Sequence, residues 1–165
     1  MTPDHRVSQS QGVFPDAVTQ FLDAGMTLID PARFAVDPAA VGELPLLPYV
    51  TLRPSIMGAI HFETDRVLQH IRPPHAAFYR RVFAAKVVVP PTMAESYGFE
   101  LTLLASNVRD VRSNVMRRFP IFQSEAYERR LMFENAAQLA VPPLTILPTA
   151  RLASKPSLIR SPLLS

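Results

Sequence analysis

Proline is the residue that most constrains how this chain can fold. The 165 residues include 17 prolines but only 5 glycines, which inverts the usual ratio of the two residue types. A proline has a fixed φ and no backbone N–H, so it is disfavoured inside helices and central strands. Most of the prolines lie between segments of periodic hydrophobicity and divide the chain into short elements. At this length we expect those elements to share one hydrophobic core.

The hydrophobic pattern between the prolines predicts helices that alternate with strands. The predicted helices are residues 14–25, 46–62, 74–83, 107–119 and 124–139, and the predicted strands are residues 26–36, 66–71, 85–89 and 98–106, with a connecting loop at residues 37–45. Such an order favours an α/β or α+β sheet with helices on its faces.

Four of the prolines lead to specific predictions about the elements that contain or precede them. Pro31 is expected to place a bulge or an edge in the first strand, because it cannot donate to a ladder. Pro54 is expected to kink the helix over residues 46–62 or to split it in two. Pro90 and Pro91 are expected to end the third strand.

Composition limits the class of protein. The predicted domain covers residues 13–139, between a flexible arm at residues 1–12 and a tail at residues 140–165 that is rich in proline and serine. The chain has no cysteine, which excludes disulfides and zinc–thiolate sites. It has no apolar run of the roughly 20 residues that cross a bilayer, and residues 1–12 do not form a secretion signal. We therefore expect a cytoplasmic protein without a membrane span.

Four sequence blocks resemble one family. The strand "RVLQHI" followed by "PPHAAFYRRVFAAKVVVPP" is similar to a strand-helix-strand corner of the Gcn5-related N-acetyltransferase (GNAT) superfamily, with Ala76, Phe78 and Tyr79 resembling the alanine, aromatic residue and tyrosine of the family's helix. "DPARF" (residues 30–34) and "RRFPIFQSEAYERRLMF" (residues 117–133) resemble N-acyl amino acid synthases of the FeeM type and, more distantly, acyl-homoserine lactone synthases. The resemblance covers roughly residues 13–133 and implies a partial GNAT-like α/β fold, a mixed sheet flanked by helices.

The resemblance implies transfer of a fatty acyl group from an acyl thioester to an amino group such as that of an amino acid. The donor is coenzyme A or an acyl carrier protein, and the thioester is a co-substrate, so no tightly bound cofactor is expected. By residue match, Asp30 is the base or water-positioning group, and Tyr79 is the acid that protonates the leaving thiolate. Arg33 and Phe34 of the matched motif, together with Arg80 and Arg81 of the predicted helix, are the candidates for contacts with the donor.

The chain departs from the family pattern at three places. Ala32 replaces a serine of the lactone synthases, and Asp30 is shorter than the glutamate at its position. The segment "VFAAK" has no glycine where GNAT helices commonly run into one. About three strands and two helices of the family fold are expected before residues 26–36, which suggests that the N-terminal part of the domain is missing. The first strand then offers an unpaired edge for association with a second copy.

Simpler explanations compete with each catalytic assignment. Asp-Pro is a common turn pair, a tyrosine can anchor a helix, and Arg80 and Arg81 can form a solvated helix face.

A second basic cluster beside aromatic residues could dock an acidic carrier protein; it comprises Arg117, Arg118, Arg129 and Arg130 with Phe119, Phe122 and Tyr127.

The sequence argues against a nucleic-acid partner and a metal site, and it leaves a non-catalytic function as an alternative. No nucleic-acid motif is present, so nucleic acid is not expected as a partner. His61, His70 and His75 lack metal-ligand spacing, so no metal site is expected. The alternative to an enzyme is a non-catalytic, truncated remnant or a module that binds an acyl carrier.

Overall fold

The computed structural model describes residues 8–31 and 38–134. Ala32, Arg33 and Phe34 of the "DPARF" motif and the predicted tail at residues 140–165 lie outside the described residues. Among those that the structure describes, no helix is both long enough and apolar enough to cross a membrane.

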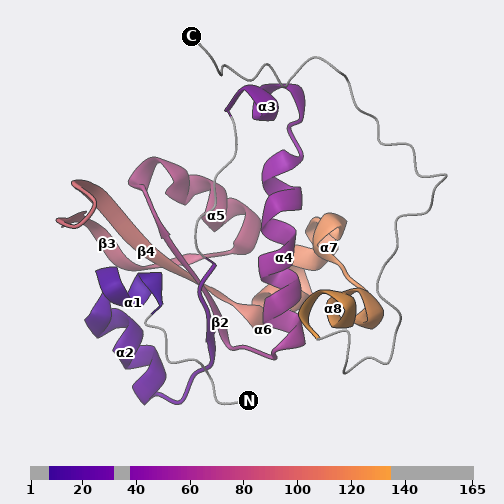
Figure 1. The fold of residues 1–165 in the computed structure, drawn as a ribbon, viewed down its shortest axis with the longest axis horizontal. Helices are drawn as coiled ribbons and strands as arrows, with labels where there is room; N and C mark the ends of the chain where they lie inside the picture. The colour runs from indigo at the N-terminus through magenta and orange to yellow at the C-terminus, as the bar shows by residue number, and fades with distance from the viewer. Residues whose placement is uncertain (1–7, 32–37, 135–165) are drawn as a thin grey trace, which may run out of the picture.

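A four-stranded mixed sheet forms the centre of the molecule (Figure 1). It consists of β1 (Leu28–Ile29), β2 (Arg66–Ile71), β3 (Lys86–Ala94) and β4 (Phe99–Asn107), in the order β1-β2-β4-β3. β1 runs parallel to β2, whereas β2 and β3 both run antiparallel to β4. β1 and β3 are therefore the edge strands, and the predicted mixed α/β class is confirmed.

Helices cover both faces of this sheet. α1 (Gln9–Val13) and α2 (Pro15–Asp23) lie on one face (Figure 1). The other face carries α4 (Leu47–His61), η1 (Pro73–His75), α5 (Ala76–Phe83), a helical segment made of α6 (Val108–Asp110), the π-turn η2 (Val111–Val115) and α7 (Met116–Arg118), then η3 (Pro120–Phe122) and α8 (Ala126–Phe133). α3 (Pro38–Glu43) precedes α4.

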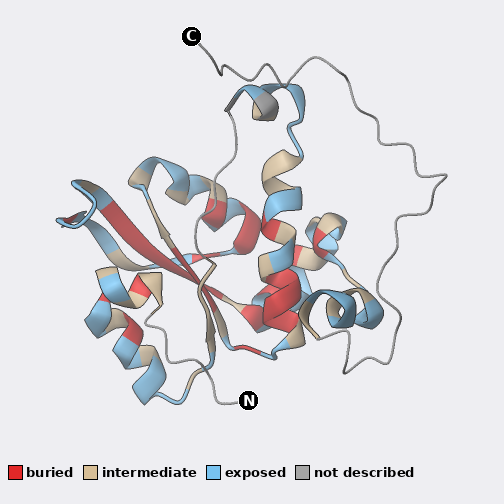
Figure 2. Cartoon of the chain, in the orientation of Figure 1, coloured by how far each residue is buried: buried red, intermediate tan, exposed pale blue. Residues whose placement is uncertain are grey.

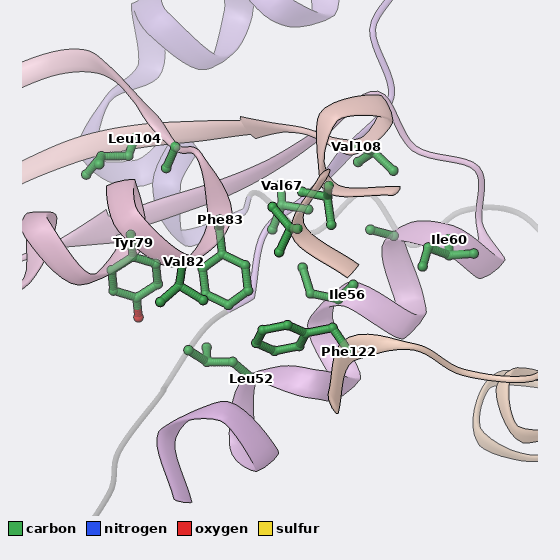
Figure 3. Close-up of a cluster of buried hydrophobic side chains, with 14 residues drawn as sticks. Leu52, Ile56, Ile60, Val67, Tyr79, Val82, Phe83, Leu104, Val108 and Phe122 are labelled. Carbon is green, nitrogen blue, oxygen red and sulfur yellow. The ribbon is translucent and has the colours of Figure 1, made fainter. Parts of the chain in front are cut away.

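The two faces hold separate hydrophobic clusters, and β2 contributes alternate residues to each. Leu68 packs with Phe14 and Val18 under α1 and α2. Val67 packs on the opposite side with the larger cluster, which contains Phe122 (Figure 3). Burial is densest where the strands meet α4 and α5 (Figure 2). Because successive side chains of a strand point to opposite faces, this alternation also determines the face on which each polar residue of β1 and β2 lies.

Local hydrogen bonds explain two departures from the prediction. The predicted flexible arm includes residues 8–12, where the structure has the start of α1, and Ser8 caps this helix by accepting from the Gln11 N–H. The expected loop at residues 37–45 contains α3.

The prolines within elements are tolerated because they are exposed. α4 is one continuous helix through Pro54, whose ring faces outward, so the predicted split does not occur. β3 continues through Pro90 and Pro91 because it is an edge strand whose register shifts between Val87 and Thr92. The prediction that these two prolines end the strand is therefore wrong.

Candidate active site

Asp30 directly follows β1, and Ser10 of α1 binds its carboxylate through two hydrogen bonds. The Ser10 N–H donates to Asp30 Oδ2 at 2.8 Å, and the Ser10 hydroxyl donates to Oδ1 at 2.7 Å. Ser10 is completely buried, and 8% of the Asp30 side chain is exposed. The carboxylate therefore fixes the start of α1 against the end of β1.

His70 joins this pair from the neighbouring strand. Its Nδ1 lies 2.9 Å from the Ser10 hydroxyl oxygen and 3.7 Å from Asp30 Oδ1, and 11% of its side chain is exposed. The strand alternation accounts for the meeting: His70 shares a face with Leu68, and Asp30 shares one with Leu28, on the side that α1 and α2 cover. Ser10, Asp30 and His70 are called the β1–β2 polar cluster below.

Hydrogen bonds hold Asp30 in its ionised form. Burial acts to raise the pKa of Asp30, but the neighbouring His70 ring and the hydrogen bonds from Ser10 outweigh it, and the net pKa lies below the ordinary value of 3.8. A carboxylate with a lowered pKa is a weak base. Asp30 is therefore better suited to orienting a neighbour than to removing a proton from an amine by itself.

The ladder between β1 and β2 stops beside this cluster. Its register covers only Leu28 with Arg66 and Ile29 with Val67. The Arg66 N–H donates to Thr27 O, so the N–H and C=O groups of Leu68 and His70 face the same edge. Pro31 has no N–H to continue the ladder, and β1 is an edge strand, which is one of the two outcomes predicted for this proline. Within the described residues, β2 has no strand partner on this side beyond Val67.

Tyr79 lies on the opposite face of the sheet from Asp30. It belongs to the cluster beneath α4 and α5, is 6% exposed, and packs against Phe78 and Phe83 with ring centroids 5.3 Å and 6.0 Å away. Burial raises the pKa of its hydroxyl, so the group stays protonated. In Figure 3 the hydroxyl points away from the strands, and it donates to no other described residue. The two residues predicted as base and acid are thus not adjacent.

The predicted donor contacts are only partly described. Arg80 and Arg81 are exposed on the last turn of α5, which is also what a solvated helix face would show. Arg33 and Phe34 lie outside the described residues. Arg72, just beyond β2, stacks its guanidinium 4.6 Å from the centre of the Phe99 ring.

The second basic cluster does not form the predicted docking surface as a unit. Phe122 is fully buried in the core, with its ring 5.0 Å from that of Phe83, so it cannot face a partner. Arg129 hydrogen-bonds to Ser124, and Arg118 stacks on Phe119 at 5.2 Å. The remaining members, Arg117, Arg130 and Tyr127, are exposed.

A polar pocket of about 450 Å³ lies at the other end of β2. Arg66, Arg109 and Arg112 line it together with Glu63 and Asp65. None of the predicted catalytic or donor-binding residues lines this pocket.

The sequence prediction missed two members of the β1–β2 polar cluster. Ser10 was assigned to the flexible arm, and nothing local marks it as a partner of Asp30. His70 carries a usable signal, because the alternation in "RVLQHI" places it on one face with Leu68. Only the strand order brings that face beside Asp30.

Comparison with known proteins relates the chain to a family model and to a solved structure. Residues 1–107 match the family model described as N-acyl amino acid synthase FeeM. Among solved structures, "The structure of FeeM, an N-acyl amino acid synthase from uncultured soil microbes" matches with a TM-score of 0.56 at 18% sequence identity. The match covers 63% of this chain and 60% of that one, so this chain spans about 60% of the length of the solved protein it resembles. No curated protein matches the chain.

Proposed function

This chain belongs to the FeeM family of N-acyl amino acid synthases, and on that premise we propose that it transfers a fatty acyl group from an acyl thioester to the amino group of an amino acid. The products are an N-acyl amino acid and a free thiol. The observation that supports this proposal most is the β1–β2 polar cluster, because it places proton-transfer groups beside the point where the ladder between the two strands ends.

Acyl transfer to an amine needs three things from a protein. A base removes a proton from the attacking nitrogen, a donor group polarises the thioester carbonyl, and an acid protonates the departing thiolate. The β1–β2 polar cluster supplies titratable groups for the first requirement. Tyr79, which burial keeps protonated, is the proposed acid.

The free edge of β2 supports a binding mode for the donor. The backbone groups of Leu68 and His70 that face this edge lack a strand partner within the described residues. An extended thioester arm that carries amide groups would pair with them in the manner of an added strand. The thioester carbon would then lie near the end of β1, between the two faces that carry Asp30 and Tyr79.

Recognition of the rest of the donor is assigned to basic residues. Arg33 and Phe34, which follow Asp30, and the exposed Arg80 and Arg81 on α5 are the proposed contacts. Coenzyme A and an acyl carrier protein share the phosphate that such arginines bind. A cytoplasmic location and self-association through the edge beside β1 also remain predictions.

Thiol release measures this activity directly. The whole chain is incubated with long-chain acyl thioesters of coenzyme A or of an acyl carrier protein and with a panel of amino acids, and mass spectrometry identifies the product. Amino-acid-dependent thiol release together with an N-acyl product supports the proposal. Thiol release without N-acylation, or none with any donor, contradicts it.

The length of the match favours one alternative of another class. Because the chain spans about 60% of the solved FeeM protein, it could bind an acyl carrier without turnover. Titration of acylated carrier protein against the chain separates the two: binding without product indicates the module, and binding with product indicates the enzyme. Salt-sensitive binding that weakens in Arg80→Ala together with Arg81→Ala, but not in Lys86→Ala on β3, would assign the contact to α5.

A further inference from the structure

The hydrogen bonds of the β1–β2 polar cluster determine which nitrogen of His70 carries a proton. The Ser10 hydroxyl has one proton, and it is donated to Asp30 Oδ1 at 2.7 Å. The contact of 2.9 Å between Ser10 Oγ and His70 Nδ1 therefore needs its proton on Nδ1. In the neutral ring this leaves Nε2 with a free lone pair, which is the state that a general base requires.

The free nitrogen is accessible. In the described part of the chain, Gln69 Oε1 is the polar side-chain atom that is both fully buried and without a hydrogen-bond partner. His70 Nε2 is not such an atom. Nε2 of His70 makes no hydrogen bond to a described residue, so it is not sealed and keeps contact with solvent. A substrate amine that replaces this solvent would meet an acceptor.

Asp30 is arranged to support His70 and not to act in its place. Both of its carboxylate oxygens accept from Ser10, one from the N–H and one from the hydroxyl. Its Oδ1, which accepts from the serine hydroxyl, lies 3.7 Å from Nδ1. The hydrogen-bonded chain therefore runs from the Asp30 carboxylate through the Ser10 hydroxyl to the His70 imidazole, whose Nε2 faces solvent.

We infer that His70 is the general base of the proposed acyl transfer, acting through Nε2, and that Ser10 and Asp30 are positioning residues that orient its ring. This assignment rests on the proposed function. Asp30, which the family resemblance matches to the base or water-positioning group, then orients the His70 ring.

The reaction step balances with His70 alone handling the proton. The amine nitrogen attacks the thioester carbon and forms the C–N bond, while the carbonyl π electrons move to oxygen. Nε2 takes one proton from the nitrogen, and the tetrahedral intermediate collapses as the C–S bond breaks. The imidazolium then returns the proton to the thiolate sulfur, so that an amide and a thiol leave.

Among the residues that the structure describes, few charged side chains lie near His70. α1 carries no charged residue, and β4 presents Leu101, Leu103 and Ala105 on this face. Asp30 is the anion against the ring, and Arg66 and Arg72 lie further along the chain on either side of it.

Nitrogen NMR of the histidine rings tests the assignment without any need for turnover. In the whole ¹⁵N-labelled chain at neutral pH, the His70 signals should report a protonated Nδ1 and an unprotonated Nε2. Ser10→Ala, which removes the hydroxyl partner, should shift the ring toward the Nε2–H form. A wild-type ring that is predominantly Nε2–H overturns the inference.

Kinetics with the active donor from the assay above give the second test. His70→Gln should lower kcat by about 10²- to 10⁴-fold with little change in the KM for the donor, while the exposed control His75→Gln should leave kcat unchanged. Asp30→Asn should lower kcat with little change in the KM for the donor, whereas a general structural defect would change both.

The outcomes separate the two proposals. Turnover by His70→Gln within about threefold of wild type overturns the base assignment while the proposed function stands. A wild-type chain that is inactive with every donor contradicts the proposed function, and the ring tautomer then still decides whether His70 is held as a base.

Discussion

The Ser10 hydroxyl donates to Asp30 Oδ1 over 2.7 Å, which links a helix at the start of the described chain to the end of the edge strand β1. The same hydroxyl oxygen lies 2.9 Å from His70 Nδ1. One serine thus connects the carboxylate expected from the family resemblance to a histidine on the next strand.

Loss of that hydroxyl should destabilise the protein. Ser10→Ala leaves a buried carboxylate oxygen and a ring nitrogen without their partner, so we expect the free energy of unfolding to fall by about 1–3 kcal/mol in urea titrations. The control is Ser113→Ala, an exposed serine whose hydroxyl contacts only the Asp110 carbonyl at 3.4 Å. Equal stability of the two variants would contradict the structural role of the cluster.

The contribution of Asp30 should depend on pH in one direction. Because the folded-state pKa of Asp30 is below its ordinary value of 3.8, the carboxylate stabilises the fold above about pH 4, and this contribution is lost as the pH falls through the folded-state pKa. Urea titrations from pH 6 to pH 2 should show the difference between wild type and Asp30→Asn shrinking at the acidic end. The exposed Asp23→Asn serves as control, and a difference that grows toward low pH would refute the assignment.

Pro54 should limit the stability of α4. It lies inside a continuous helix and deprives the Val50 carbonyl of its helical donor, although both residues are exposed. Pro54→Ala should therefore raise the free energy of unfolding by about 1–3 kcal/mol. Pro48→Ala in the first turn of the same helix should change it little, because no helical donor is needed there. A Pro54→Ala variant no more stable than wild type would show that the proline costs α4 nothing.

The acid role of Tyr79 can be separated from its packing role. Tyr79→Phe keeps the ring contacts, and the hydroxyl has no partner in the described part of the chain, so stability should change little. If the hydroxyl protonates the thiolate, kcat should fall by about 10²-fold with an alkyl thioester and much less with an aryl thioester, whose thiolate leaves without a proton. Equal losses with both donors would argue against the role; Tyr97→Phe on the exposed surface is the control.

The sequence predicted correctly those elements whose bounds follow from their own local pattern of hydrophobic residues. β2 matches the predicted residues 66–71, and α5 and β4 fall within two residues of theirs. β3 was predicted too short because its tolerance of Pro90 and Pro91 depends on its place at the sheet edge, which is a property of the strand order.

The candidate site shows the same limit. The family motif led to Asp30, and the structure provides a physical reason for it in the contacts with Ser10 and His70. Neither partner could be paired with Asp30 from local patterns, because Ser10 is 20 residues away and His70 reaches it only through the parallel pairing of β1 with β2. The alternation of residues within a strand shows which side chains share a face, but it does not specify which strands pair.

Product formation by the whole chain tests the central claim most directly. Wild-type protein, His70→Gln and His75→Gln are each incubated with an acyl thioester and an amino acid, and the N-acyl product is measured by mass spectrometry. The account predicts product from wild type and His75→Gln, and a loss of at least about 10²-fold in His70→Gln. A folded wild-type chain that binds the donor and forms no N-acyl product would contradict the account.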